Sequence, residues 1–255
     1  MWSVLGLGAL QGLTEFLPVS SSGHLIVLKT ILGVASPGAA LEVALHLGTL
    51  AAVLWAYRRW IGRWLTELAQ GRRAAWRLMG LLTAASVPAA GAGLLLGHVV
   101  EQYFTVGAVA VGWMCTTVLL WATPIGRSGR PLEQMRWWQA AVIGCAQALA
   151  LWPGLSRSGT TIAMARAVGV KGEDAAQFSF LMAIPAVIGA SLFEFGAMSH
   201  PRVSWSLLIL AALLAAVTGV VAIQWVKGIV QQSRAWRAMG IYTAAAAVAV
   251  WLIGG

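Results

Sequence analysis

The chain has 255 residues, of which 59% are apolar and only 10% are charged, and its formal net charge is +9. This composition, with a mean hydropathy of +0.79, excludes an ordinary soluble domain and predicts an all-α polytopic membrane protein. A transmembrane helix needs about 20 apolar residues. In chain order, the stretches long enough to cross a membrane are residues 40–57, 77–97, 104–122, 175–197, 204–226 and 236–253.

Two further apolar regions, residues 3–33 and 137–169, are interrupted near the middle by proline, glycine and serine. The interruptions read FLPVSSSGH and LWPGLSRSG, and each leaves two arms that are too short to span a bilayer. Irregular backbone at membrane depth is stable only where protein or a water-filled cavity satisfies its polar groups. We therefore expect six transmembrane helices and two re-entrant helical hairpins.

The basic residues are distributed unevenly across this predicted topology. Fourteen of them fall on one side of the membrane, whereas Lys29 and Arg202 fall on the other side. The fourteen are Arg58, Arg59, Arg63, Arg72, Arg73, Arg77, Arg127, Arg130, Arg136, Arg166, Lys171, Lys227, Arg234 and Arg237. Because basic residues gather in cytoplasmic loops, we expect this side to be cytoplasmic and both termini to face outward. Arginines facing anionic lipid headgroups account for the net charge, so no nucleic-acid partner is predicted.

The two interrupted regions also resemble each other in sequence. Four residues of the first recur 136 positions later: Gln11, Ser20, Ser22 and Gly23 match Gln147, Ser156, Ser158 and Gly159. Each half contains one hairpin and three spans, and an odd number of crossings places the halves in opposite orientations. We interpret residues 1–255 as a single integral membrane domain with inverted-topology repeats at about 1–122 and 137–255. In such folds the broken helices build the functional site near the bilayer midplane.

The first interruption brings acid–base and nucleophilic side chains together. Gln11 and Glu15 are one helical turn apart and share a helix face, and Pro18 ends that helix. Beyond the proline, Ser20 and His24 are again separated by one turn. A carboxylate, hydroxyls and an imidazole on one short break suit general acid–base or covalent catalysis.

Plainer interpretations of these residues remain open. Glu15 could act only as a counter-ion for Arg157, and His24 could make a hydrogen bond within the core. Glu42 and His46 are also one turn apart, near the outer end of the first span, and we expect them to be structural or peripheral. The only two cysteines, Cys115 and Cys145, are expected to be free and buried.

The second interruption has the components of a phosphate site. Arg157 offers paired donors for an anion, and it precedes a new helix N-terminus with free backbone N–H groups. A charge at membrane depth is costly, so it needs a functional or structural reason. Neither break contains enough cysteine, histidine or carboxylate for a zinc site. A divalent cation such as Mg²⁺ or Ca²⁺, held by Glu15 and by phosphate oxygens of a substrate, is compatible with the residues.

The motifs QGLTEFLPVSSSGH and PGLSRSGTT, in this order, resemble those of the undecaprenyl-diphosphate phosphatase family, the bacitracin-resistance membrane phosphatases. The resemblance covers essentially the whole chain, including the segments LEVALHLGTLAAVLW and EDAAQFSFLMAIPAVIGA. It implies active-site roles for nine residues, which are Gln11, Glu15, Ser20, Ser21, His24, Ser156, Arg157, Ser158 and Thr161. Many members of the family have Glu where this chain has Gln11, which removes one potential metal ligand.

The family implies hydrolysis of undecaprenyl diphosphate to undecaprenyl phosphate and inorganic phosphate. This reaction recycles the lipid carrier of peptidoglycan and confers bacitracin resistance. The implied location is the bacterial plasma (inner) membrane, with an active site that opens to the outer, periplasmic face. We expect Glu15, Ser21, His24 and Arg157 to be catalytic, and the other five residues to bind substrate. Ser21 activated by His24, His24 itself, or a water molecule could be the nucleophile.

Two other functions fit some of the same features. Inverted repeats with broken helices are common in transporters, so the chain could instead flip the lipid carrier or export a phosphorylated solute. The type-2 phosphatidic-acid phosphatases share a superficial likeness to SSSGH and SRSG, but the chain lacks the other elements of their signature. The many small residues are compatible with a homodimer, although no single Gly-x-x-x-Gly pair decides it.

Overall fold

The computed structural model describes residues 1–31, 39–125, 129–194 and 203–254, and regular structure in these ranges is helical apart from one isolated bridge between Arg130 and Val170. The α-helices are α1 (Trp2–Phe16), α2 (Ser21–Ile31), α3 (Ala39–Ala56), α4 (Arg58–Ala69), α5 (Arg73–Glu101), α6 (Val106–Ala122), α7 (Trp137–Leu149), α8 (Arg157–Ala167), α9 (Gly172–Phe193), α10 (Trp205–Ile229) and α11 (Ser233–Gly254). A short 3-10 helix, η1 (Leu132–Gln134), precedes α7.

Each of the six predicted spans coincides with a helix, namely α3, α5, α6, α9, α10 and α11. Five of these helices, α3, α5, α9, α10 and α11, are long and apolar enough to cross a membrane, and α6 is a shorter apolar helix. Arg127, Arg202 and the last residues of the predicted span 175–197 lie outside the described residues. The two predicted interruptions separate α1 from α2 and α7 from α8.

Helix α4 was not expected, because its arginines suggested a loop between two spans. Trp60, Ile61 and Trp64 share one of its faces and pack against the large buried core, whereas Arg59 and Arg63 are exposed. This spacing is typical of a helix that lies on a surface with one apolar face. An arginine-rich segment can therefore be helical without crossing the membrane.

Glycines bring the first helix of each interrupted pair very close to a long helix of the other half. A Cβ atom on Gly8 of α1 would lie 2.5 Å from the carbonyl oxygen of Ala211 in α10. A Cβ atom on Gly144 of α7 would lie 2.4 Å from the carbonyl oxygen of Ala85 in α5. Small residues allow such close packing of helix backbones. This packing fixes α1 and α7, and hence both interruptions, within the bundle.

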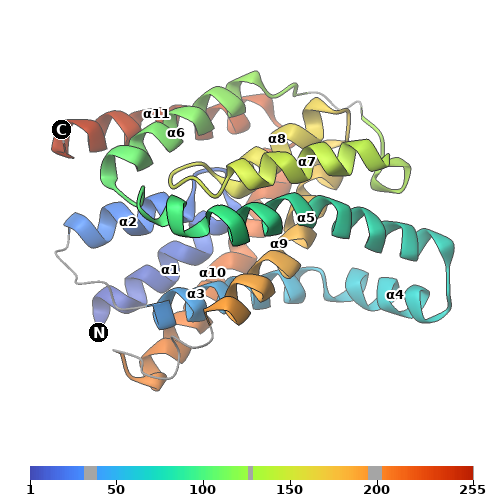
Figure 1. Ribbon diagram of the computed structural model, residues 1–255, viewed down its shortest axis with the longest axis horizontal. Coiled ribbons are helices and arrows are strands. Elements are labelled where there is room, and N and C mark those ends of the chain that lie inside the picture. Colours follow the sequence, from blue (N-terminus) through green and yellow to red (C-terminus); the bar gives the residue numbers. More distant parts are fainter. Residues whose placement is uncertain (32–38, 126–128, 195–202, 255) are drawn as a thin grey trace.

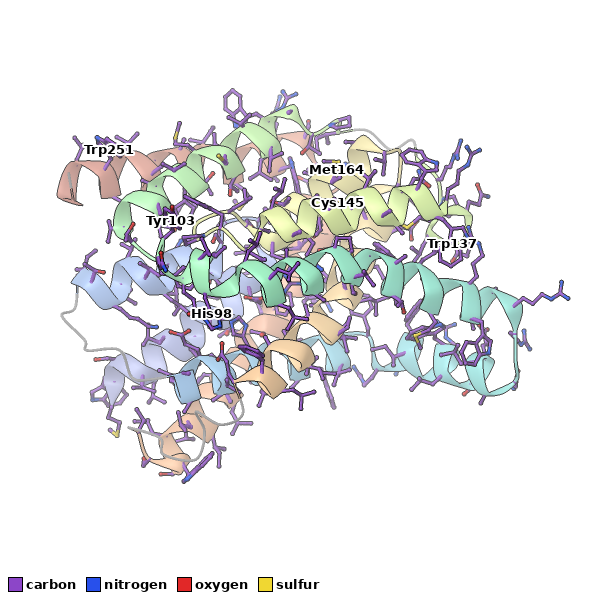
Figure 2. The ribbon with its side chains drawn as sticks, viewed as in Figure 1. His98, Tyr103, Trp137, Cys145, Met164 and Trp251 are labelled. Carbon is purple, nitrogen blue, oxygen red and sulfur yellow. The ribbon has the colours of Figure 1, made fainter. Side chains whose placement is uncertain are left out.

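Both termini lie at one end of the bundle, and α4 lies at the opposite end (Figure 1). Trp137, at the start of α7, and Trp251, near the end of α11, lie toward opposite ends (Figure 2). The side chain of Cys145 projects from α7 (Figure 2), and Cys115 and Cys145 are both free and exposed. The expectation that these thiols are buried was wrong, because an apolar segment of a membrane protein presents one face outward.

Candidate active site

The first interruption contains a strained residue next to a new helix. Leu17, which precedes Pro18, has an extended backbone, as proline requires of its predecessor. Ser20 has a φ of +67°, the only positive φ of a non-glycine residue in the described chain. Its hydroxyl accepts a hydrogen bond from the backbone N–H of Gly23 at 3.3 Å, so it caps the start of α2. The interruption therefore has a defined conformation, which places Ser21 at the first turn of α2.

The second interruption ends in the same kind of cap. The hydroxyl of Ser156 accepts a hydrogen bond from the backbone N–H of Gly159 at 3.1 Å, and α8 begins at Arg157. Gly154 has a φ of +85°, and a Cβ atom on it would lie 2.3 Å from the carbonyl oxygen of Val109 in α6. Only glycine fits a position with both properties. The turn therefore packs against α6 and directs the first turn of α8 toward α1.

The two interruptions meet through an ion pair between Glu15 and Arg157. Arg157 Nη2 lies 2.5 Å from Glu15 Oε1, and the two side chains are 19% and 7% exposed. Nearby, the hydroxyl of Ser158 donates a hydrogen bond to the carbonyl oxygen of Leu17 at 3.0 Å. Because isolated buried charges are costly, each partner of this pair is needed to stabilise the other. Residues that are 142 positions apart in sequence are thus neighbours in the fold.

The second oxygen of the Glu15 carboxylate organises the first interruption. The hydroxyl of Ser21 donates a hydrogen bond to Glu15 Oε2 at 2.6 Å, and Gln11 Nε2 donates one to the same oxygen at 3.1 Å. A carboxylate at this distance can accept the hydroxyl proton of Ser21, which would turn the serine into a nucleophile. Gln11, Glu15, Ser21 and Arg157 form one connected group, which we call the Glu15 cluster.

His46 also lies beside this cluster, although we expected it to be structural or peripheral. Its Nδ1 lies 3.2 Å from Gln11 Nε2 and 4.0 Å from Glu15 Oε2. Since the amide nitrogen of Gln11 can only donate, His46 Nδ1 accepts the hydrogen bond. The expectation for Glu42 was closer, because its carboxylate pairs with Lys29. Spacing within α3 could not show that His46 faces α1, since this contact depends on how the two helices pack.

His24 lies outside the Glu15 cluster. Its Nδ1 lies 2.6 Å from the carbonyl oxygen of Ser20, and its Nε2 lies 2.6 Å from the hydroxyl of Tyr242 in α11. A carbonyl oxygen only accepts, so Nδ1 carries a proton, and in a neutral ring Nε2 accepts from the hydroxyl of Tyr242. The ring also packs edge-on against Trp113, with 5.0 Å between the ring centroids. Both ring nitrogens therefore contact groups other than Ser21.

The remaining predicted residues contact backbone groups and other hydroxyls, and not the carboxylate of Glu15 or the guanidinium of Arg157. Ser20 and Ser156 cap helices, as described above, and Ser158 contacts the backbone of the first interruption. The hydroxyl of Thr161 lies 2.6 Å from that of Ser179 in α9 and donates to the carbonyl oxygen of Arg157 at 2.8 Å. These residues hold the two interruptions in place, whereas the Glu15 cluster presents reactive groups.

Two polar atoms of the cluster are buried without a hydrogen-bond partner. They are Oε1 of Gln11 and Nη1 of Arg157. Buried polar atoms are normally satisfied, and those that are not point to a ligand or to water. The described residues contain no group of three or more His, Cys, Asp or Glu side chains that could hold a metal ion. A free guanidinium donor beside a serine and a carboxylate suits an anionic substrate, and phosphate is one of the anions whose geometry matches the arginine fork.

Comparison with known proteins identifies the family of the chain. Residues 4–249 match the family of the bacitracin resistance protein BacA. The chain belongs to this family. Both interruptions and the Glu15 cluster lie within the matched residues. Because it has this family membership and several helices that can cross a membrane, the chain is a multi-pass membrane protein.

Several relatives of this BacA family chain are named undecaprenyl-diphosphatase. The one from Desulfatibacillum aliphaticivorans is 37% identical over an alignment of 254 positions, which covers 91% of each chain. The one from Kineococcus radiotolerans is 39% identical over an alignment of 264 positions, which covers 97% of this chain and 91% of the relative. The one from Rubrobacter xylanophilus is 43% identical over 206 residues, which cover 74% of each chain. The similarity therefore extends over most of both proteins.

Proposed function

We propose that this BacA family protein hydrolyses undecaprenyl diphosphate to undecaprenyl phosphate and inorganic phosphate. The observation that carries the proposal is the arrangement around Arg157. One of its terminal nitrogens pairs with Glu15, and the other is buried without a partner, next to a serine that donates to the same carboxylate. The names of the relatives support this substrate. The product would return to cell-wall synthesis as a lipid carrier, which is consistent with bacitracin resistance.

In the mechanism that we propose, Ser21 is the nucleophile and Glu15 is its base. The Ser21 hydroxyl oxygen attacks the terminal phosphorus while its proton moves to Glu15 Oε2, 2.6 Å away. The bond between the phosphorus and the bridging oxygen breaks, and undecaprenyl phosphate leaves as an anion that needs no proton. Water then attacks the phosphoserine, Glu15 returns the proton to Ser21, and inorganic phosphate is released. Arg157 Nη1 stabilises the negative charge on the transferred phosphoryl group.

A divalent cation fits this site only together with the substrate. Glu15 would provide the one carboxylate ligand and Gln11 Oε1 a neutral amide oxygen, and the diphosphate and water would complete the shell that Mg²⁺ or Ca²⁺ requires. When bound, such an ion would neutralise part of the diphosphate charge. The residues themselves act without it in the steps above: Glu15 moves a proton, and Arg157 holds phosphate.

We further propose that the two halves form an inverted-topology repeat with two re-entrant hairpins in the bacterial inner membrane. The serine caps of the two interruptions are equivalent in the repeat, and so are Gly8 and Gly144, which permit the close contacts with α10 and α5. Both termini lie at the end of the bundle opposite to α4 (Figure 1). Since α4 carries several arginines, its end is cytoplasmic, and the termini face the periplasm.

The orientation of the site follows from this topology. His46 lies in the N-terminal half of α3, toward the end that carries the termini, and its side chain is 41% exposed. The cluster would therefore open to the periplasmic face, where the diphosphate headgroup enters while the isoprenoid tail remains in lipid.

The experiment is to measure phosphate release from undecaprenyl diphosphate by the purified protein and by an Arg157→Ala variant. We expect rapid release by the wild type and loss of release by the variant. If the wild type releases no phosphate in active lipid but moves the lipid carrier across vesicle membranes, the proposal is wrong. That result would favour the flippase that the repeat architecture also allows.

A further inference from the structure

A polar cavity lies far along the bundle from the Glu15 cluster, at the end that carries α4. It has a volume of about 430 Å³ and lies among the end of α3, the first turns of α4, the start of α9 and the end of α10. Its lining residues are Ala56, Tyr57, Arg58, Arg59, Trp60, Arg63, Gln177 and Lys227. None of these residues takes part in the reaction proposed above.

The lining of this cavity, which we call the α4 cavity, is strongly basic. Four of its eight residues are arginine or lysine, and none carries a carboxylate. The ammonium nitrogen of Lys227 lies over the ring of Tyr57, 4.9 Å from its centroid. Arg58 is partly engaged elsewhere, since its Nη1 donates to the carbonyl oxygen of Trp55 at 2.8 Å.

Two carboxylates lie near this region: Glu173, and Glu67 in a neighbouring cavity that Arg58, Arg59 and Arg63 also line. Burial, and secondarily the charge of Glu173, raise the pKa of the Tyr57 hydroxyl above its ordinary value. Glu173 accepts a hydrogen bond from Gln231 and does not line the cavity. Neither carboxylate lines the α4 cavity, and two carboxylates do not balance the four cations that line it, so the α4 cavity favours an anion.

An unsatisfied donor in the same cavity gives independent evidence for a ligand. The side-chain nitrogen Nε2 of Gln177 is buried and has no hydrogen-bond partner. A buried amide N–H without a partner is costly, and an oxygen of a bound anion would satisfy it. Such an amide has no role in general attraction between basic residues and a negative surface, so it points to a ligand that enters the cavity.

The position of the cavity along the helices selects the type of anion. Helix α3 ends at Ala56 and α10 ends at Ile229, two residues after Lys227, and both helices are candidate membrane spans. The lining residues Tyr57 and Lys227 are therefore at the depth where lipid phosphates lie, given the membrane placement proposed above. Trp60 adds an amphipathic ring of the kind that is enriched at this depth.

We propose that the α4 cavity binds the phosphate group of an anionic membrane lipid at the cytoplasmic face. Arg59, Arg63 and Lys227 would supply charge-assisted hydrogen bonds to the phosphate, and Gln177 would donate to one of its oxygens. The acyl chains would remain beside α3 and α10. This site is separate from the Glu15 cluster, and the proposal rests on the proposed topology but not on the proposed reaction.

The test measures lipid binding to the detergent-purified protein by native mass spectrometry. Phosphatidylglycerol, phosphatidylcholine and inorganic phosphate are the three probes. We compare Arg63→Gln/Lys227→Gln with the control Arg73→Gln/Arg234→Gln, which removes the same charge from exposed residues outside the cavity. Gln177→Leu removes the donor at constant net charge.

We expect the cavity double variant to weaken phosphatidylglycerol binding by about tenfold or more, as the loss of charge-assisted hydrogen bonds implies. Gln177→Leu should weaken binding by a few-fold, and the control should leave it within about twofold of the wild type. Equal losses in the cavity and control variants would overturn the proposal, because they would show diffuse attraction.

Equal affinity for phosphatidylcholine would also overturn the proposal, and so would displacement of phosphatidylglycerol by inorganic phosphate at the same concentration. All variants should elute as the wild type does on gel filtration and release phosphate at the wild-type rate. Because binding is measured without turnover, failure of the proposed reaction would not affect this result.

Discussion

Replacing Arg157 with lysine separates the two tasks that the structure gives to this side chain. Arg157 Nη2 pairs with Glu15, and Nη1 is buried and free for a phosphate oxygen. Lysine keeps the positive charge but has a single nitrogen, so it cannot reproduce the planar fork of two nitrogens. The variant should therefore keep the ion pair with Glu15, fold normally and lose the bond to the transferred phosphoryl group.

The expected fall in kcat/KM of Arg157→Lys follows from the loss of one hydrogen bond between charged groups. Such a bond contributes about 1.5–3 kcal/mol, which corresponds to a fall in kcat/KM of roughly 10- to 150-fold. Most of this fall should appear in kcat, because the charge on the phosphoryl oxygens grows as the transition state forms. Thermal stability in detergent should change little, since the buried charge of Glu15 is still paired.

The assay measures initial rates of phosphate release across a range of undecaprenyl diphosphate concentrations. Arg234→Lys is the matched control, because Arg234 is exposed at the start of α11 and lies outside the cluster. The control should match the wild type. Wild-type kcat/KM for Arg157→Lys, in a protein with unchanged stability, would refute the assignment of Nη1 to the phosphoryl group.

Three further predictions concern packing, positioning and the cation. Gly12→Ala should destabilise the protein by about 1–3 kcal/mol in thermal unfolding, because the added Cβ atom would lie 2.3 Å from the carbonyl oxygen of Ala215. Gly6→Ala, with nothing within 4 Å, should stabilise α1, and equal losses in both variants would contradict this. His46→Ala should lower kcat/KM by about tenfold, since Gln11 loses an acceptor, and His46→Asn should restore part of it; equal rates in all three proteins would exclude a positioning role. Removal of divalent cations with a chelator should slow phosphate release, and addition of Mg²⁺ or Ca²⁺ should restore the rate. A rate that the chelator leaves unchanged would show that the protein residues suffice.

The sequence predicted the interruptions well, because their causes are local. Pro18 ends α1 whatever it packs against, and the serines cap the helices that follow because their hydroxyls reach backbone N–H groups three residues later. The possibility that Glu15 is a counter-ion for Arg157 also followed from the cost of a lone charge at membrane depth. The structure confirms this ion pair.

What the sequence could not predict depends on packing between distant segments. His46 contacts Gln11 because α3 packs beside α1, and Tyr242 reaches His24 from a helix more than 200 residues later. The positive φ of Ser20 could not be read from a residue type that rarely adopts it. Helix α4 was missed because its arginines masked the apolar face that Trp60 and Trp64 form. Periodicity within one segment carries no information about such contacts.

The most direct test of the account is the rate of phosphate release from undecaprenyl diphosphate by Ser21→Ala, measured beside Ser22→Ala. The two serines are adjacent, but only Ser21 donates to Glu15, whereas the Ser22 hydroxyl contacts that of Ser20. We expect that Ser21→Ala loses at least about a thousandfold in rate and that Ser22→Ala stays within about tenfold of the wild type. A Ser21→Ala rate close to that of the wild type would contradict the nucleophile and the mechanism that depends on it.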